Sequence, residues 1–413
     1  MFVAEIRLQK GLWRGVAGVL CLLVLLALRP ESAQAGFGLL SHCTGANNCG
    51  MGGAGVAVPL DATAAAQNPA GMGRVDQQYY ISPGWMSGHR TIDIQGNPAV
   101  VNVVGRQNSA KNNFGQMSGG VNFRPRADLA YGITMTGIGG MGSKYREGRT
   151  LAGLAGGYDN TVFYGCFQFL PTIAWSPRSN LTIGFSGVIG YSQIKANIPS
   201  PTLAAPMANL KMDRAWGVGA KAGILWDPYP WVTLGAAVSS PVWFQSFESY
   251  DDVIRSPMNT PFNTQFGAAW HIMPGTDLAV DFRYIAYSHV TVIGKSPDAG
   301  GFGWNDSIAM LVGMQHQLTE SWIVRGGFQL SNSALPKENA FASALVPGMQ
   351  RRQFSTGAAY EINDNWEVSG NFEATLKSQM TDPGTGGTVS ALGAGTHITG
   401  YSFGINLGLL RHF

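Results

Sequence analysis

The residues of this sequence that could bind a metal or form a covalent link gather close to its N-terminus. Cys43 and Cys49 stand near each other in the chain, and His42 directly precedes the first of them. Two thiols and one histidine make an incomplete ligand set for zinc, because structural zinc sites use four ligands. In an oxidising compartment the two cysteines could form a disulfide instead. A disulfide or a pair of free thiols is therefore favoured, and no metal is predicted.

Other patterns that resemble catalytic or cofactor motifs lack the surroundings those motifs need. The stretch Gly50–Gly55 fits G-x-G-x-x-G by its letters, but it follows no predicted strand and begins no βαβ unit, so it predicts no dinucleotide site. The seven histidines form no H-E-x-x-H motif. Asp281 and Arg283 are interpreted as a structural ion pair, and Glu367 and Glu373 as part of a solvated face. The sequence predicts no enzyme, no catalytic residue and no cofactor.

The N-terminus has the form of a secretory leader. Basic residues precede an uninterrupted apolar run, Gly15–Leu28, and Ala33-Gln34-Ala35 matches the A-x-A cleavage pattern. The run is too short to span a bilayer as a helix, although an uncleaved anchor helix is the alternative. We therefore expect residues 1–35 to be a signal peptide and the mature chain to begin at Gly36.

Composition favours a membrane β-barrel for the rest of the chain. Charged residues make up only 12% of the 413 residues, 56 are glycine, and the net charge of +3 is too small to suggest nucleic-acid binding. From Tyr401 to Leu409, apolar side chains alternate with serine, glycine and asparagine. This period of two is typical of a strand with one face on lipid and the other on a lumen.

Such stretches recur fourteen times, and the connections between them are short and long by turns. Both ends of the array then lie on the short-turn side, which is the topology of an outer-membrane barrel with periplasmic turns and extracellular loops. An open sheet edge in hydrocarbon would leave backbone groups unpaired, so the sheet must close. The predicted fold is all-β, a 14-stranded antiparallel transmembrane β-barrel over residues 78–413; a secreted all-β domain is the alternative. The expected strands are 78–94, 115–124, 128–138, 160–176, 180–196, 212–226, 231–247, 262–273, 276–291, 305–317, 320–332, 352–362, 365–377 and 398–413.

Residues 36–77 precede the first strand and do not alternate. The alanine run after Asp61 predicts a short helix that this carboxylate caps and that Asn68-Pro69 ends. A compact apolar segment would fit the wide lumen of a 14-stranded barrel, although a periplasmic tail outside it is the alternative. We therefore expect residues 36–77 to form a small N-terminal hatch with short helices that plugs the barrel. The candidate hatch motif comprises Asp61, Asn68, Pro69 and Ala70.

The stretch Asp61-Ala62-Thr63 followed by Asn68-Pro69-Ala70-Gly71-Met72 resembles the start of the FadL/OmpP1/TodX family of outer-membrane hydrophobic-compound transporters. The segments Trp304–Ser307 and Trp322–Phe328 and the terminal Phe413 are also similar to that family. The resemblance implies an apolar groove among the extracellular loops, a pocket beside the N-terminus and a lateral exit at a kink in the third strand. Fatty acids, alkanes and aromatic hydrocarbons are the implied substrates. The Cys43–Cys49 pair is not part of the family pattern.

The predicted route combines the N-terminus, three loops and the third strand. Loops 139–159, 197–211 and 333–351 carry apolar residues that could capture an apolar solute, or could equally pack on one another as a cap. Glycines would permit the kink, unless they are ordinary small residues facing the lumen. The predicted substrate-binding and gating residues are Phe37, Leu39, Leu40, Met141, Leu151, Leu154, Leu203 and Met207, and the kink glycines are Gly132, Gly137 and Gly139.

The resulting function is passive uptake of hydrophobic compounds across the outer membrane of a Gram-negative bacterium. A general diffusion porin and a structural or adhesin barrel are the alternatives. The expected partners are outer-membrane lipid and lipopolysaccharide, hydrophobic small molecules, and the barrel assembly machinery through Phe413. No nucleic-acid partner is expected, and the protein is predicted to be a monomer.

Overall fold

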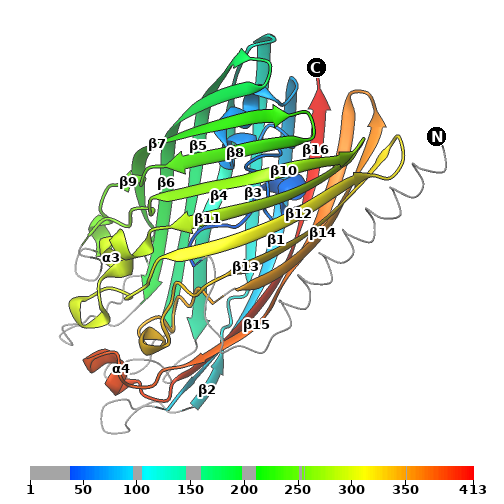
Figure 1. The fold of residues 1–413 in the computed structure, drawn as a ribbon. Helices are drawn as coiled ribbons and strands as arrows, with labels where there is room; N and C mark the ends of the chain where they lie inside the picture. Colours follow the sequence, from blue (N-terminus) through cyan, green and yellow to red (C-terminus); the bar gives the residue numbers. More distant parts are fainter. Residues whose placement is uncertain are drawn as a thin grey trace. The chain divides into compact units, whose positions relative to one another are not determined.

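The structure is a computed structural model that describes residues 38–95, 105–145, 160–197, 211–250, 254, 256–349 and 351–413. Fourteen long strands of this part of the chain form a closed antiparallel sheet, because β16 pairs back with β1 (Figure 1). The predicted 14-stranded barrel is therefore confirmed. The long strands are β1 (Gln78–Ile94), β3 (Asn113–Arg126), β4 (Leu129–Tyr145), β5 (Asn160–Arg178), β6 (Leu181–Asn197), β7 (Asp213–Tyr229), β8 (Val232–Ser239), β10 (Asn263–Met273), β11 (Thr276–Ile285), β12 (Ser307–Gln317), β13 (Trp322–Ser331), β14 (Arg352–Asn363), β15 (Trp366–Thr381) and β16 (His397–His412), and the two short ones are β2 (Gly105–Asn108) and β9 (Trp243–Phe244).

The strand boundaries differ most from the prediction at three places. The predicted strand 231–247 is divided into β8 and β9 by residues 240–242, where Pro241 has no N–H to donate to a ladder. The predicted strand 276–291 ends at Ile285, because the apolar side chains that follow pack into the loop rather than along the wall. The predicted strand 128–138 continues to Tyr145, so part of the expected loop 139–159 is strand.

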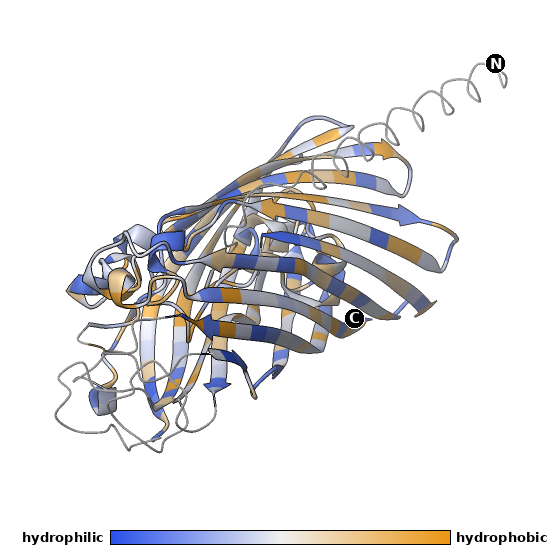
Figure 2. Cartoon of the chain, turned by 90° about the horizontal axis from the view of Figure 1, so that it is seen from below, coloured by the Kyte–Doolittle hydropathy of each residue, from blue (hydrophilic) through white to orange (hydrophobic). Residues whose placement is uncertain are grey.

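The strands separate an apolar outer face from a small and polar inner face. On β16, Ile405 and Leu407 are exposed, whereas Asn406 between them is buried, as is Ser402 earlier in the strand. Figure 2 shows the same alternation of hydrophobic and hydrophilic residues along several strands. The exposed apolar side chains form the surface that meets lipid, as the period of two in the sequence predicts.

Prolines before three of the short turns lie in the strands rather than in the turns themselves. Pro125, Pro177 and Pro228 each fall in a register shift of the ladder, directly before the turn. A bulge leaves residues unpaired, so it accommodates a residue without an N–H. The predicted strands ended before these prolines, whereas the observed strands continue past them, so each turn lies slightly later in the chain than predicted. The shifts lie between Phe123 and Arg126, Trp175 and Arg178, and Trp226 and Tyr229.

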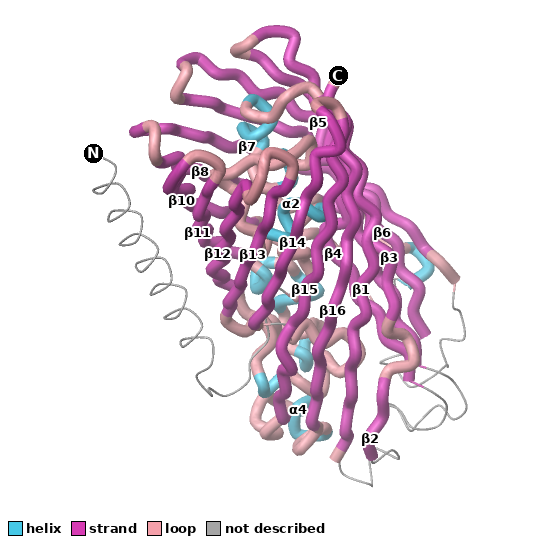
Figure 3. Tube along the Cα trace, turned by 90° about the vertical axis from the view of Figure 1, so that its right-hand side faces the viewer, coloured by secondary structure: helices cyan, strands magenta, loops and turns pink. Residues whose placement is uncertain are grey.

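The wall is longer on one side than on the other. Strands β4–β7 contain 17 to 19 residues, whereas β10–β13 contain 10 or 11. A tilted strand of about 9–11 residues already crosses the hydrocarbon core. The longer strands therefore continue beyond the bilayer at the end that carries the long loops. Figure 3 shows β16 running between β15 and β1 in the wall.

The segment before β1 lies inside the ring of strands, where Figure 3 shows its short helices. Its elements are α2 (Gly45–Gly50), η1 (Ala64–Ala66) and η2 (Pro69–Gly73). Asp61 accepts hydrogen bonds from the N–H and hydroxyl of Thr63 (2.8 and 2.5 Å), the residue before η1, but no side chain caps η1, so the predicted cap by this carboxylate is not formed. Asn68 caps η2, because its side chain accepts from the Ala70 N–H. The Asn68-Pro69 pair thus begins a second helix, where the sequence predicted only the end of one. None of the described helices is long and apolar enough to cross a bilayer.

Polar side chains of the wall hold this inner segment by its backbone. The Asp281 carboxylate accepts hydrogen bonds from the N–H groups of Gly55 and Val56, at 2.7 and 2.9 Å. The Asn122 amide donates to two carbonyl oxygens of residues 72–75, and the Thr134 hydroxyl donates to a third, of Ala62. Asp281 is therefore bonded to the hatch, and not paired with Arg283 as the sequence suggested.

The described parts of the loops after β8, β11 and β13 pack against one another in one apolar cluster. Leu335 and Phe341 of the loop after β13 are buried, and the Trp304 indole donates a hydrogen bond to the Ser343 hydroxyl at 3.1 Å. This loop behaves as the packed cap that the sequence left open as an alternative. The short helices of the loops are η3 (Glu248–Tyr250), η4 (Tyr287–His289), α3 (Thr291–Gly294), η5 (Pro297–Ala299), η6 (Lys337–Asn339) and α4 (Thr388–Leu392).

One carboxylate joins two of these loops in a way that depends on pH. Asp298 accepts hydrogen bonds from the N–H groups of Val389 and Thr388, at 2.9 Å each. These two bonds lower the pKa of Asp298 from its usual 3.8. Because the pKa is lower in the folded state, the bonds stabilise the loops above pH 3.8 and are lost as pH falls through the folded pKa. We expect the Thr388 and Val389 amides to lose hydrogen-exchange protection below about pH 3.8.

The variant Asp298→Ala should show this low protection throughout the range from pH 6 to pH 2. Asp364→Ala, which removes an exposed carboxylate from a short turn at the other end, is the control and should behave like the unmodified protein. Equal protection of the two amides in both variants at pH 6 would contradict the prediction.

Candidate functional site

The wall of the barrel is interrupted between β3 and β4. Their ladder runs from Arg126 and Leu129 to Ser118 and Thr136 and ends there, among residues that the structure describes on both strands. β3 continues back to Asn113, still paired with β1, and β4 continues to Tyr145, still paired with β5. We call the interval between residues 113–117 of β3 and 137–145 of β4 the lateral window.

A bulge in β4 lies at the end of the lateral window where the β3–β4 ladder stops. Gly137 pairs with Phe167 and Gly139 pairs with Cys166, so Ile138 is an extra residue in β4. A bulge bends its strand, and glycines on either side make the bend easier. Gly137 and Gly139 therefore lie at the bend. Gly132 lies in regular pairing instead, where a side chain would collide with Met72 of the hatch, so it is not one of the kink residues.

The first described residues of the chain, 38–41, occupy the edge of β4 that β3 leaves unpaired. We call them the N-terminal segment. Leu40 forms a β-bridge with Gly139, and the Ser41 N–H donates a hydrogen bond to the Ile138 carbonyl at 2.5 Å. A Cβ atom on Gly139 would lie 2.2 Å from the Leu39 carbonyl oxygen, so only glycine permits this approach. The bulge thus bends β4 and also provides the backbone on which the N-terminal segment docks.

Tyr287 of η4 holds the same segment from the opposite side. Its hydroxyl accepts hydrogen bonds from the N–H groups of both Leu39 and Leu40, at 3.0 Å each. Burial raises the pKa of Tyr287 to about 12. The hydroxyl therefore remains protonated at physiological pH, and the two leucines are buried beneath it.

A cavity of about 410 Å³ lies between the N-terminal segment and the lateral window. Leu39, Leu40 and Met141 line it on the inside, together with Trp304 from the loop after β11. The cavity touches residues on both faces of β5. Tyr164 is a buried lining residue on the inner face. Phe163 and Phe167 also line the cavity, and they lie on the opposite face because side chains alternate along a strand. The cavity thus extends through the lateral window to the outer face of the wall.

Aromatic and basic side chains fill the lateral window. The Arg90 guanidinium donates a hydrogen bond to the Gly142 carbonyl, and Phe114 packs so closely on Gly142 that a Cβ atom there would lie 2.8 Å from its ring. The Lys111 ammonium lies 3.9 Å from the centre of the Phe163 ring. Burial, and secondarily the charge of Lys195, lower the pKa of Lys111. Side chains therefore fill most of the window, and at its far end the Ala110 N–H donates a backbone hydrogen bond to the Lys144 carbonyl at 2.7 Å.

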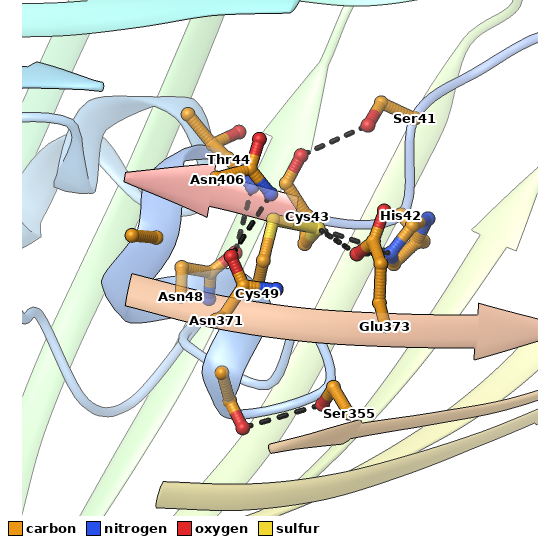
Figure 4. Close-up of a disulfide and its surroundings, with 12 residues drawn as sticks. Ser41, His42, Cys43, Thr44, Asn48, Cys49, Ser355, Asn371, Glu373 and Asn406 are labelled. Carbon is orange, nitrogen blue, oxygen red and sulfur yellow. Dashed lines mark hydrogen bonds and ion pairs between the residues drawn. A yellow bond between two sulfur atoms is a disulfide. The ribbon is translucent and has the colours of Figure 1, made fainter. Parts of the chain in front are cut away.

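Polar groups line the cavity on the side of β15 (Figure 4). The His42 imidazole lies 3.1 Å from a carboxylate oxygen of Glu373, and the Gln353 amide contacts both groups. Next to His42, a disulfide joins Cys43 and Cys49, with an S–S length of 2.04 Å. Glu373 is buried, which corrects its interpretation as part of a solvated face.

The structure brings together only some of the predicted site residues. Leu39, Leu40 and Met141 line the cavity; Phe37, Leu151, Leu154, Leu203 and Met207 lie outside the described residues. The hatch motif lies elsewhere, at β6 and β7, where the Asn68 amide donates to the carbonyls of Val56 and Ile224. Sequence reasoning missed the aromatic residues of the window, because an apolar side chain facing a lateral cavity has the same spacing as one facing lipid. These residues are Phe114, Phe163 and Phe167.

Comparisons with known proteins agree with this architecture. Residues 26–407 match the family model described as outer membrane protein transport protein (OMPP1/FadL/TodX). The structure is similar to a Pseudomonas aeruginosa FadL homologue (TM-score 0.66, 14% identity, 91% of this chain and 100% of that one). It is also similar to the Pseudomonas putida toluene transporter TodX (TM-score 0.66, 12% identity, 92% and 99%) and the Ralstonia pickettii toluene transporter TbuX (TM-score 0.63, 14% identity, 90% and 99%). A comparison with curated proteins gives no match.

Proposed function

The chain belongs to the OMPP1/FadL/TodX family of outer membrane transport proteins, and from this premise we propose that it is a passive channel for small hydrophobic compounds. It is an outer-membrane β-barrel with the fold of hydrophobic-compound transporters. The observation that carries the proposal is the cavity of about 410 Å³, which joins the docked N-terminal segment to the outer face of the wall. A water-filled porin would need an open lumen, whereas hatch segments occupy this one.

We propose that an apolar solute enters the cavity from the extracellular side and displaces the N-terminal segment. The solute gains about 0.8 kcal/mol for each methylene group that leaves water. The closed state keeps two hydrogen bonds between Tyr287 and the backbone of Leu39 and Leu40. Two neutral hydrogen bonds contribute about 1–3 kcal/mol, so burial of a few methylene groups supports their displacement. No coupling to ATP or to a proton gradient is required.

The solute then leaves sideways between β3 and β4. Release into lipid needs no β3–β4 ladder bonds to break, because that ladder ends at Ser118 and Thr136, and the Ala110–Lys144 backbone bond lies at the far end of the lateral window. Once the N-terminal segment is displaced, the side chains that fill the window must move, among them Phe114 and Arg90. Toluene-sized aromatic compounds and longer alkyl chains both have the apolar character that this route requires.

The direct experiment is uptake of a labelled panel by cells with and without the gene. The panel comprises toluene, hexadecane, oleate and, as a polar control, glucose. We expect faster uptake of at least one apolar member and no change for glucose. Equal uptake of every apolar member with and without the gene would contradict the proposal, and large, steady ion conductance in planar bilayers would favour a general porin.

The variant Tyr287→Phe tests the gate within that function. It removes the hydroxyl that accepts from Leu39 and Leu40 but keeps the ring, so we expect initial uptake of the apolar substrate to rise by about tenfold, as a loss of 1.4 kcal/mol from the closed state predicts. The matched control is Tyr284→Phe, whose hydroxyl donates to Asp306 instead. The gate is disproved if Tyr287→Phe and deletion of residues 36–40 both leave uptake unchanged.

A further inference from the structure

Three potential metal ligands converge where the hatch meets β15. The His42 Nε2 atom lies 3.0 Å from the Cys43 Sγ atom and 3.1 Å from a Glu373 carboxylate oxygen. The sulfur and that oxygen are 3.5 Å apart, and all three atoms lie within 4.8 Å of one another. Cys49 lies next to this cluster of three, because its sulfur is bonded to that of Cys43. The sequence alone offered only two thiols and a histidine, and the fold adds the carboxylate.

The spacing of these atoms is close to that of donors around one zinc ion. Zinc binds sulfur at about 2.3 Å and nitrogen or oxygen at about 2.0–2.2 Å, with tetrahedral geometry, so its ligand atoms lie roughly 3.2–3.8 Å apart. The separations of 3.0, 3.1 and 3.5 Å need only small adjustments to reach that range. Thiolate, imidazole and carboxylate are all ligands that zinc accepts in proteins.

The surroundings favour a built site over an accidental contact. Glu373 and Cys43 are buried, at 4% and 6% exposure, and His42 is partly buried. The Gln353 amide donates to the Glu373 carboxylate at 3.2 Å, and such outer partners orient the ligands of metal sites. The ligands come from two parts of the chain, the hatch and β15, and their side chains point toward one another (Figure 4).

We propose that reduction of the Cys43–Cys49 disulfide creates a binding site for one Zn²⁺ ion, held by His42, Cys43, Cys49 and Glu373. The disulfide and the metal are alternative states of the same site. A dithiol reductant supplies two electrons and two protons, which convert the disulfide to two thiols, while the reductant becomes a cyclic disulfide. Zinc then binds the two thiolates, and the two thiol protons are released to solvent.

The two states connect the hatch to the barrel differently. The disulfide closes a short loop within the hatch, whereas the metal would link three hatch residues to Glu373 of the wall. His42 is two residues from Leu40, which docks at the lateral window. Zinc binding would therefore fix the segment that closes the cavity, and the oxidised protein would lack this link.

The test uses the full-length mature protein, purified in detergent, reduced with dithiothreitol and desalted without oxygen. Co²⁺ is the probe, because thiolate-bound cobalt in a tetrahedral site absorbs visible and near-ultraviolet light. We expect one equivalent of Co²⁺ to produce this spectrum in the reduced protein and none in the oxidised protein. Zn²⁺ should then displace the Co²⁺ and abolish the spectrum.

Variants separate this site from other thiols. Cys166→Ser removes the cysteine that lies outside the disulfide in the described chain, and it should leave the spectrum unchanged. Cys43→Ser/Cys49→Ser should abolish the spectrum, and Glu373→Gln should weaken Zn²⁺ binding at least about tenfold, since even loss of an outer partner has that effect. Folding of each variant is checked by heat-modifiable electrophoretic mobility, and His42→Gln replaces Glu373→Gln should the latter not fold. The proposal is overturned by folded, reduced protein without the cobalt spectrum, or by unchanged affinity in the ligand variants.

Discussion

Deletion of Ile138 should reduce uptake of apolar substrates to the level of cells without the gene. Ile138 is the extra residue of the bulge in β4, between Gly137 and Gly139. Its removal restores regular pairing with β5 and leaves the side chains beyond it on the same face. A straight β4 can continue its ladder with β3 beyond Ser118, and each new backbone hydrogen bond closes part of the lateral window. We expect more than a tenfold loss, because even about 1.4 kcal/mol of added closure has that effect.

The control for this deletion keeps the bulge and changes only the side chain. Ile138→Ala retains the extra residue, so it should retain most of the uptake. Slow hydrogen exchange at residues 115–117 of β3 in the deletion variant would show that the window had closed. The lateral route would be wrong if this new protection appeared while uptake remained normal.

Replacement of Asp281 by alanine should open the lumen to ions. The carboxylate is buried and accepts hydrogen bonds from the N–H groups of Gly55 and Val56. The substitution leaves two buried donors without this acceptor, at a cost of about 1–3 kcal/mol each. That cost disfavours the docked position of residues 55–56, so we expect them to detach from the wall. We expect a severalfold increase in single-channel conductance in planar bilayers.

Asp281→Asn is the matched variant for this prediction. Its amide keeps one oxygen acceptor of nearly the same shape, so the conductance should rise less than in Asp281→Ala. A conductance of Asp281→Ala equal to that of the unmodified protein would mean that the remaining bonds, such as those from Asn122, hold the hatch without Asp281.

The sequence predicted the barrel well because each strand repeats the same constraint. A strand between lipid and a hatch must alternate, and β16 shows this from Tyr401 to Leu409. The alternating pattern gave a wrong prediction where apolar residues with the same spacing pack in a loop rather than against lipid. Tyr287 continues the apolar spacing of Ile285 in β11, yet it packs in the loop core. The distinction depends on what lies opposite each side chain, which only the folded chain determines.

The candidate site was less predictable than the fold, because most of its contacts join distant residues. Glu373 reads as one more polar residue of an alternating strand, and only the folded hatch places His42 beside it. The lateral window is the absence of a ladder, and no residue type marks a missing hydrogen bond. Gly137 and Gly139 were the residues that indicated the bend. Gly132 is also a glycine, but its role is different, because it leaves room for the Met72 side chain.

The way in which the wall holds the hatch affects how freely the two can diverge in evolution. Asp281, Asn122 and Thr134 bind backbone atoms of the hatch, so the identities of the bound residues are free to change provided that they remain small enough to approach. Selection then acts on a few polar side chains of the wall and on the space around the hatch. Most residues of such a segment can be substituted without loss of these backbone contacts, which is compatible with the same fold at 12–14% identity.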